Sequence, residues 1–232
     1  MFNAKYYIIC NSLGVKMELK SNAMYALLVV FVIVTVFNSF MLSTMGAAPR
    51  TSTHRSVQLT GDPVQDAINA VIPTGTPEYG PALGVSFDDP VAGISVLSNL
   101  HRQIPTDSLS AEEKQRYIGI GTKISCEFCC SAPAVVDSSG RDLCGCAHAQ
   151  SFMGLSKYLI QNTGLSDDEI LWELTKWKSL YYPRNMVEKA AAALENGLEL
   201  TPEVLNDRDL LKKIGSGNTA DIGSLPQMVG GC

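Results

Sequence analysis

The chain has 232 residues, of which 46% are hydrophobic and 18% charged, and its formal net charge is −5 at pH 7. This length accommodates one domain with a hydrophobic core, together with additional segments. The acidic balance argues against the basic surface with which nucleic-acid-binding domains neutralise phosphates, so we expect no nucleic-acid partner.

An uncharged apolar run lies near the N-terminus. No residue between Ala23 and Phe37 is charged, and Val, Leu, Ile and Phe dominate the run. Extended to Leu42, it reaches the roughly 20 residues that a helix needs to cross a bilayer. We therefore predict a transmembrane anchor over residues 23–42, with an N-terminal flank over residues 1–22. A cleaved signal peptide is the alternative interpretation.

The orientation of this predicted anchor is not set by its flanking charges. Lys16 and Lys20 precede the run, and Arg50 and Arg55 follow it, so the positive-inside rule favours neither side. A single N-terminal span before one large domain is typical of a signal anchor or signal peptide. We therefore expect a membrane-anchored protein whose soluble domain is extracytoplasmic.

The rest of the chain divides by composition into a linker, a domain and a tail. Residues 43–61 are rich in Ser, Thr, Gly and Pro and show no apolar period, which is typical of a linker. Residues 62–214 carry repeated helix signals and are predicted to form a helical metal-binding domain. Residues 215–232 form a flexible, glycine-rich tail that ends at Cys232.

Two kinds of helix-start signal recur in the predicted domain. An Asp before a Pro caps the free N–H groups of a first turn, and a Ser three residues before a Glu forms a capping box. Apolar side chains then follow at helical spacing, which predicts a mainly α-helical fold. The signals stand at Asp62-Pro63, Asp89-Pro90, Ser110 with Glu113, and Ser166 with Glu169.

Five of the seven cysteines and one of the three histidines fall within 23 positions. The pattern is C-x2-C-C, then thirteen residues, then C-x-C-x-H. Closely spaced cysteines can turn their sulfur atoms toward one point across a tight turn, and two such groups can surround one metal ion. The predicted ligands are Cys126, Cys129, Cys130, Cys144, Cys146 and His148, with Cys232 as a further candidate that Gly230-Gly231 would allow to fold back.

The segment between the two cysteine groups predicts a small β-hairpin that carries the cluster. Ala134 to Val136 favour a strand, and residues 137–140, Asp-Ser-Ser-Gly, have turn chemistry. Cys146 and His148 then lie at the start of the next helix. A helix N-terminus stabilises a thiolate, which lowers the pKa of a cysteine there and favours metal binding or reactivity.

Soft sulfur ligands select zinc, Cu(I) or iron–sulfur chemistry. We expect zinc or copper, with an iron–sulfur cluster less favoured. Six clustered ligands exceed the four of a structural zinc site. The surplus suits a site with more than one metal ion, or a labile site that passes an ion along, so we expect a protein that captures, stores or transfers a metal ion. Three alternatives remain open: structural disulfides, a thiol–disulfide redox protein, and a disulfide-stapled structural or interaction module.

The motifs Cys126-Glu-Phe-Cys129-Cys130 and Cys144-Gly-Cys146-Ala-His148 resemble those of exported, cysteine-rich microbial proteins, one group of which carries a PCYCGC motif. The two cysteine groups stand in a different order here. The resemblance implies exported metal or redox binding and supplies no catalytic residue. The sequence also contains no H-E-x-x-H, G-x-S-x-G or Walker A pattern, so an enzyme is not the favoured interpretation. The sequence identifies no protein partner.

Overall fold

The computed structural model describes residues 60–217 and 222–231, the helical residues 25–26 and 28–35, and two short strands. The chain divides into two compact units, Met1–Thr53 and His54–Cys232. Each unit is described by itself.

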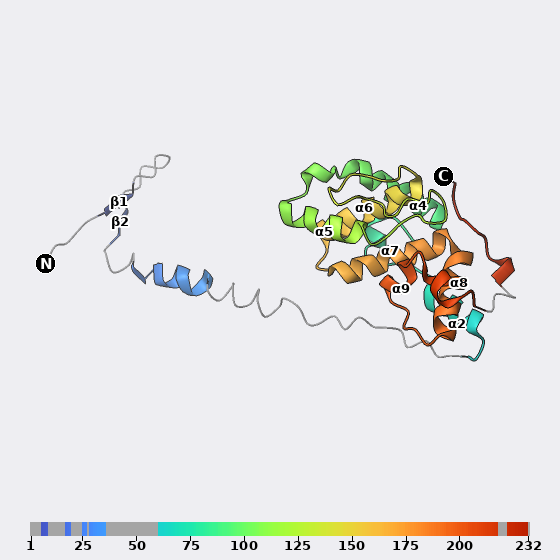
Figure 1. The fold of residues 1–232 in the computed structure, drawn as a ribbon. Helices are drawn as coiled ribbons and strands as arrows, with labels where there is room; N and C mark the ends of the chain where they lie inside the picture. Colours follow the sequence, from blue (N-terminus) through green and yellow to red (C-terminus); the bar gives the residue numbers. More distant parts are fainter. Residues whose placement is uncertain are drawn as a thin grey trace. The chain divides into compact units, whose positions relative to one another are not determined.

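The N-terminal unit contains the strands β1 (Tyr6–Ile8) and β2 (Met17–Leu19), which pair antiparallel with Tyr7 opposite Glu18 (Figure 1). Part of the predicted anchor, residues 25–26 and 28–35, is helical. Among the helices that the structure describes, none combines the length and the hydropathy needed to cross a membrane. Residues 36–42 of the predicted anchor and 43–59 of the predicted linker lie outside the described residues.

The second unit is a bundle of helices, which confirms the prediction of a mainly α-helical fold (Figure 1). Two 3-10 turns at Thr106–Ser108 and Ile222–Ser224 accompany the α-helices. The α-helices are α2 (Pro63–Val71), α3 (Gly80–Leu83), α4 (Pro90–Gln103), α5 (Ala111–Gly121), α6 (Ala147–Asn162), α7 (Asp167–Tyr181), α8 (Pro183–Glu195), α9 (Pro202–Asn206) and α10 (Leu210–Ile214).

The helices α2, α4, α5 and α7 begin where the sequence predicts, because a side chain accepts hydrogen bonds from the free backbone N–H groups of each of these first turns. The carboxylate of Asp62 accepts hydrogen bonds from the backbone nitrogens of Val64 and Gln65 at 3.0 and 3.2 Å. Both predicted capping boxes, at the starts of α5 and α7, are formed in both directions. The cap of α4 is Asp89, which accepts from the backbone nitrogen of Ala92 at 3.1 Å.

The central helix is α6, which packs against α4, α5 and α7. Every residue from Ser151 to Lys157 is buried, so this helix is enclosed on all sides rather than along one stripe. Its buried Lys157 donates hydrogen bonds to the carbonyl oxygens of His101, at 3.0 Å, and Ile104, at the C-terminal end of α4. The enclosure of α6 matters for the site, because the first turn of this helix carries two of the predicted ligands.

The contact between α4 and α6 depends on Gly154. A Cβ at this position would lie only 2.7 Å from the backbone nitrogen of His101 and would also meet the carbonyl oxygen of Leu97. We expect Gly154→Ala to lower the free energy of unfolding by about 1 to 3 kcal/mol, the usual cost of overpacking. Urea denaturation measures this change. Gly119→Ala on α5, with no neighbouring atom within 4 Å, is the matched control, and equal losses in both variants would contradict the close approach.

The predicted hairpin of strands between the cysteine groups is not formed as such. One isolated antiparallel bridge, Val136 opposite Asp142, closes a tight turn instead. The carboxylate of Asp137 accepts from the backbone nitrogens of Ser139 and Arg141 at 2.9 and 3.0 Å, and these bonds organise the turn. Beyond the bridge, Val135 donates its N–H to the carbonyl of Ile124 at 2.9 Å. The carbonyl oxygen of Val135 still accepts from Leu143 at 2.9 Å, but because its N–H is used by Ile124, the pairing of the two arms does not continue into strands.

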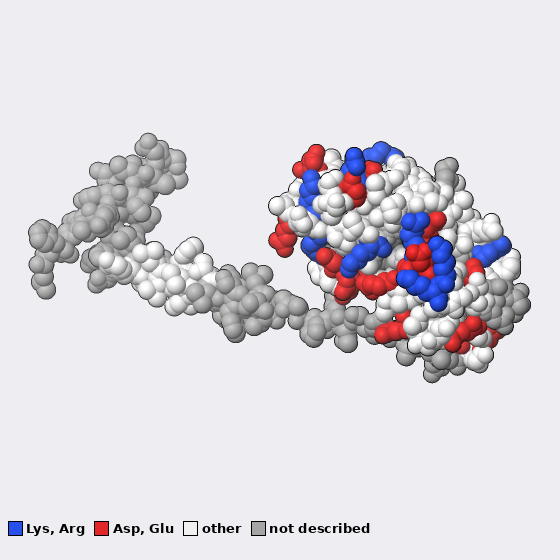
Figure 2. All heavy atoms as spheres, viewed as in Figure 1, with Lys and Arg blue, Asp and Glu red and all other residues white. Residues whose placement is uncertain are grey.

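Charged side chains of both signs are intermixed on the face of the helical unit in Figure 2. Ion pairs of this kind include Lys212 with Asp209 at 2.7 Å and Lys213 with Asp207 at 2.6 Å. On the face that the figure shows, the basic groups therefore do not form a separate patch. The absence of a nucleic-acid partner stays a prediction from net charge.

Candidate metal centre

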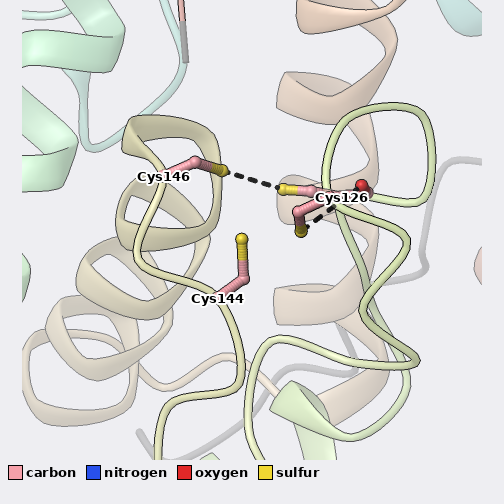
Figure 3. Close-up of side chains that lie close together, drawn as sticks. Cys126, Cys144 and Cys146 are labelled. Carbon is pink, nitrogen blue, oxygen red and sulfur yellow. Dashed lines mark hydrogen bonds between the residues drawn. The ribbon is translucent and has the colours of Figure 1, made fainter.

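Four cysteine sulfur atoms meet in one small volume. The Sγ atoms of Cys126, Cys130, Cys144 and Cys146 all lie within 4.8 Å of one another, and all four are free thiols. Figure 3 shows Cys126 and Cys146 pointing toward each other from two different segments, with Cys144 beside them. A tetrahedral zinc ion with bonds of about 2.3 Å holds its sulfur atoms about 3.8 Å apart. Small inward movements of the side chains would therefore complete four-coordination.

The first two cysteines are brought together by a helical turn rather than by the C-x-x-C spacing. The backbone nitrogens of Cys129 and Cys130 both donate to the carbonyl oxygen of Cys126, at 3.1 and 3.3 Å. Residues four apart in such a turn lie on one side, so Cys130 and Cys126 face the same point. The turn ends at Ser131, whose φ of 55° is left-handed. Arg208 holds this residue by donating to its carbonyl oxygen at 3.0 Å.

Cys146 is the N-terminal cap of α6, and its sulfur accepts a hydrogen bond from the backbone nitrogen of Ala149 at 3.4 Å. The thiol of Cys126, whose sulfur is 3.3 Å away, lowers the pKa of Cys146 to about 3, with further contributions from His148 and from the backbone of Ala149. The pKa of Cys146 is therefore lowered mainly by the neighbouring thiol, and the backbone N–H at the helix start contributes less.

The remaining thiols differ in their environment. The bond to Cys146, followed by burial, raises the pKa of Cys126. Burial raises the pKa of Cys144 to about 12. Cys126 is 1% exposed and Cys144 8%, whereas Cys130 is exposed. The cluster therefore has a buried side and one edge, at Cys130, that solvent reaches.

His148 lies beside the four sulfur atoms and is not one of the four grouped ligands. It is fully buried, and its Nε2 donates to the carbonyl oxygen of Val229 at 2.8 Å. The imidazole also hydrogen bonds to Cys146 and lowers the pKa of that thiol. Its ring packs between Tyr181 and Tyr182, with centroids 5.0 and 5.1 Å away. In this arrangement His148 fixes the position of Cys146, which is what an outer partner does for a ligand in a metal site.

One further predicted ligand, Cys129, is not among the four grouped cysteines, and another, Cys232, is not described. Cys129 is disulfide-bonded, and none of the described free cysteines is its partner. Its sulfur is therefore not grouped with the four. Cys232 lies outside the described residues.

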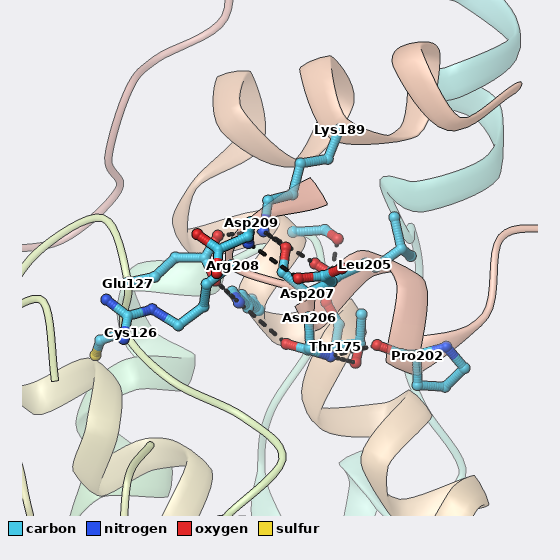
Figure 4. A network of polar contacts seen from close by, with 12 residues as sticks. Cys126, Glu127, Thr175, Lys189, Pro202, Leu205, Asn206, Asp207, Arg208 and Asp209 are labelled. Carbon is cyan, nitrogen blue, oxygen red and sulfur yellow. Dashed lines mark hydrogen bonds and ion pairs between the residues drawn. The ribbon is translucent and has the colours of Figure 1, made fainter. Parts of the chain in front are cut away.

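The sequence interpretation missed a buried ionic network beneath the first cysteine turn (Figure 4). The carboxylate of Glu127, 4% exposed, accepts from Lys178 on α7 at 3.1 Å and from Lys189 on α8. Lys178 also donates to Asn206 at 3.0 Å. Burial lowers the pKa of Lys178 to about 8. The sequence does contain one indication that these lysines are buried, because both stand among apolar residues on their helices.

This network places positive charge next to the cluster. Two ammonium groups share one carboxylate, and Glu127 directly follows Cys126 in the chain. A divalent ion held by four thiolates is a negatively charged centre. Buried charge requires a nearby counter-charge, and the surplus ammonium group provides one.

Comparisons of the chain with known protein families, with curated proteins and with solved structures found no match. The case for a function therefore rests on the geometry of the cluster.

Proposed function

We propose that this protein binds a soft metal ion, zinc or copper, through the sulfur atoms of Cys126, Cys130, Cys144 and Cys146. One observation carries the proposal: all four Sγ atoms lie within 4.8 Å of one another. Thiolates prefer soft metals, and a tetrahedral set of four sulfurs is a geometry typical of zinc. Zinc is therefore the first candidate and copper the second.

The role that we propose is capture, storage or transfer of the ion. Cys130 is exposed, while Cys126 and Cys144 are buried. An ion held in this way can be reached by an incoming thiol or chelator from one edge, without unfolding of the domain. A purely structural zinc site does not need a ligand that solvent reaches.

Elemental analysis of the full-length protein, purified without oxygen and paired with a count of free thiols, tests the proposal. We expect about one metal ion for each chain and protection of four thiols from alkylation while the ion is bound. Protein that contains no metal, takes up neither added Zn(II) nor Cu(I), and keeps its four thiols reactive would contradict it.

Metal affinity should fall as the pH falls, because ligand thiols must lose their protons to bind. The pKa values of Cys126 and Cys144 are raised, so both thiols carry protons at neutral pH. Releasing at least these two protons makes the affinity fall by at least about a hundredfold for each unit by which the pH falls. Competition titrations with a chromophoric chelator between pH 6 and 8 measure the slope. An affinity that does not change across this range would contradict the protonated state of these ligands.

A thiol–disulfide redox protein is the second candidate function. The sulfur atoms of Cys126 and Cys146 are 3.3 Å apart, and the pKa of Cys146 is lowered to about 3, so a thiolate faces a thiol. In exchange with the disulfide of a substrate protein, this pair would form a Cys126–Cys146 disulfide, and the substrate disulfide would take up the two electrons and leave as a thiol and a thiolate. Insulin-reduction activity of metal-free protein that disappears in Cys146→Ser would favour this function over metal binding.

We further propose that residues 23–42 attach the domain to a membrane and that the domain lies outside the cytoplasm. The support is the uncharged run from Ala23 to Phe37 and the resemblance of the cysteine motifs to those of exported proteins. Carbonate extraction of membranes, followed by protease accessibility of the domain in intact cells, tests both parts. Recovery of the full-length protein in the soluble cytoplasmic fraction would contradict them.

A further inference from the structure

Residues 222–231, the last that the structure describes, form a segment that we call the C-terminal strap (Figure 1). After the 3-10 turn at Ile222–Ser224 the strap has no regular secondary structure. Ile222 is 2% exposed and is the only fully buried residue of the strap. Burial of apolar side chains therefore contributes little to holding this segment on the helical unit.

Hydrogen bonds hold the strap at two places. Near its end, the backbone N–H of Val229 donates to the carbonyl oxygen of Tyr181 at 2.8 Å, and the carbonyl oxygen of Val229 accepts from Nε2 of His148 at 2.8 Å. Tyr181 is the last residue of α7, and His148 lies in the first turn of α6. The strap thus joins the end of one helix to the start of another.

The other attachment is to Arg184, in the first turn of α8. The guanidinium group of Arg184 donates to the carbonyl oxygens of Gly223 and Leu225 at 3.0 and 2.9 Å, and its backbone N–H donates to the carbonyl oxygen of Pro226 at 3.3 Å. The N–H groups of a first turn and the carbonyl groups of a last turn have no partner inside their own helix. The strap supplies partners for one of each kind, at Arg184 and Tyr181.

The end of the strap lies against the first turn of α6, at whose start Cys146 belongs to the cluster. His148, which binds the strap, is fully buried and follows Cys146 by two positions. Gly230 approaches the same imidazole. A Cβ at this position would lie 3.6 Å from Nε2 of His148 and would overlap the side chain of Ile94 on α4. The strap therefore covers the His148 side of the cluster, whereas the edge at Cys130 is exposed.

Resting on the proposed metal binding, we propose that the C-terminal strap is a lid whose lifting opens a second route for release of the metal ion. A segment with few buried apolar contacts opens locally at a low cost in free energy, without unfolding of the domain. Lifting removes the hydrogen-bond acceptor of His148 and lets water reach the first turn of α6. Cys146, which is partly buried with the strap in place, then becomes a second ligand, besides Cys130, that an incoming thiol or chelator displaces.

Gly230→Ala in the full-length protein tests the lid, because the alanine disfavours the seated strap. The φ of Gly230 is 75°, which an L side chain rarely adopts, and the added Cβ would overlap Ile94. We expect the population of the lifted strap, and with it the rate of zinc release to excess chelator, to rise by about 5- to 30-fold. Stopped-flow mixing with a chromophoric chelator measures the release, and hydrogen exchange of the Val229 amide in metal-free protein measures the lifting.

Arg184→Gln is a second variant that loosens the strap without altering its own backbone. It removes the hydrogen bonds to Gly223 and Leu225, at the end of the strap that is farther along the chain from His148. We expect faster hydrogen exchange of the strap and faster zinc release, as in Gly230→Ala. The two variants share only the lifting of the strap, so agreement between them supports the lid.

Gly231→Ala is the matched control, since a Cβ at this neighbouring position would meet no atom within 4 Å. It should leave both hydrogen exchange and zinc release unchanged, and an effect as large as that of Gly230→Ala would overturn the inference. If Gly230→Ala speeds hydrogen exchange but not zinc release, or changes neither, the strap is not a lid and the inference is overturned, although metal binding stands. If the unmodified protein takes up no zinc, the proposed function and the inference fall together.

Discussion

Replacing Cys126 by serine should abolish stoichiometric metal binding and lower the affinity for Zn(II) by more than about a hundredfold. Removal of a residue that only hydrogen bonds to a metal ligand typically lowers the affinity by about 10- to 100-fold, and the loss of a ligand itself should be larger. Cys126 is 1% exposed, and its sulfur is 3.3 Å from that of Cys146, so a serine there leaves a hard oxygen in a buried soft site. Elemental analysis and Zn(II) competition titrations measure the change.

Cys129→Ser is the control that the same turn supplies. Cys129 stands between two of the four clustered cysteines in sequence, but its sulfur is disulfide-bonded rather than grouped with theirs. This variant should keep its metal ion and most of its affinity. Loss of metal in Cys129→Ser with retention in Cys126→Ser would show that the C-x-x-C spacing, and not the four-residue turn, sets the ligands.

The existence of the cluster could be predicted from spacing alone, because short intervals between cysteines limit how far apart their sulfur atoms can lie. Which of the clustered residues group their sulfur atoms could not be predicted from spacing. Cys130 joins the site because Cys130 and Cys126 are linked by an i to i+4 hydrogen bond of 3.3 Å. His148 points its Nε2 to Val229, 81 residues away in the chain. Such long-range contacts leave no local signal.

The starts of α2, α4, α5 and α7 were predictable for a different reason: each has a capping side chain within three residues of the backbone N–H group that it satisfies. The extent of the small hairpin was not predictable from sequence. Its pairing competes with a hydrogen bond to the segment after α5, in which the N–H of Val135 donates to the carbonyl oxygen of Ile124 at 2.9 Å. The position of the two lysines among apolar residues indicates their burial, but the sequence does not show which acidic group they meet. Lys178 and Lys189 come from two helices and meet Glu127 only in the folded chain.

That network leads to the largest expected change in stability. Glu127→Gln removes the only carboxylate that contacts the buried ammonium groups of Lys178 and Lys189 among the described ion pairs. Breaking a buried ion pair by removing one partner costs about 3 to 5 kcal/mol, since the remaining charge stays buried. We expect a loss of this size in the free energy of unfolding at pH 7, measured by urea denaturation of metal-free protein.

The loss should depend on pH in a defined direction. The folded-state pKa of Lys178 is already lowered to about 8, against about 10.4 in the unfolded chain, and removal of Glu127 lowers it further. Between these two pKa values the unfolded state binds more protons, so the stability of Glu127→Gln must rise as the pH rises toward 10. A denaturation series from pH 7 to 10 that shows a constant or falling stability would contradict this account.

Two comparisons separate the network from a general effect of lost charge. Asp209→Asn breaks the exposed pair with Lys212, whose side chains are 58% and 81% exposed, and pairs of this kind contribute at most about 1 kcal/mol. Adding Lys189→Met to Glu127→Gln removes one of the two stranded ammonium groups and should restore part of the stability. If the double variant is less stable than Glu127→Gln alone, removal of one buried charge has not restored stability. The packing of the Lys189 side chain would then contribute more to stability than its buried charge costs.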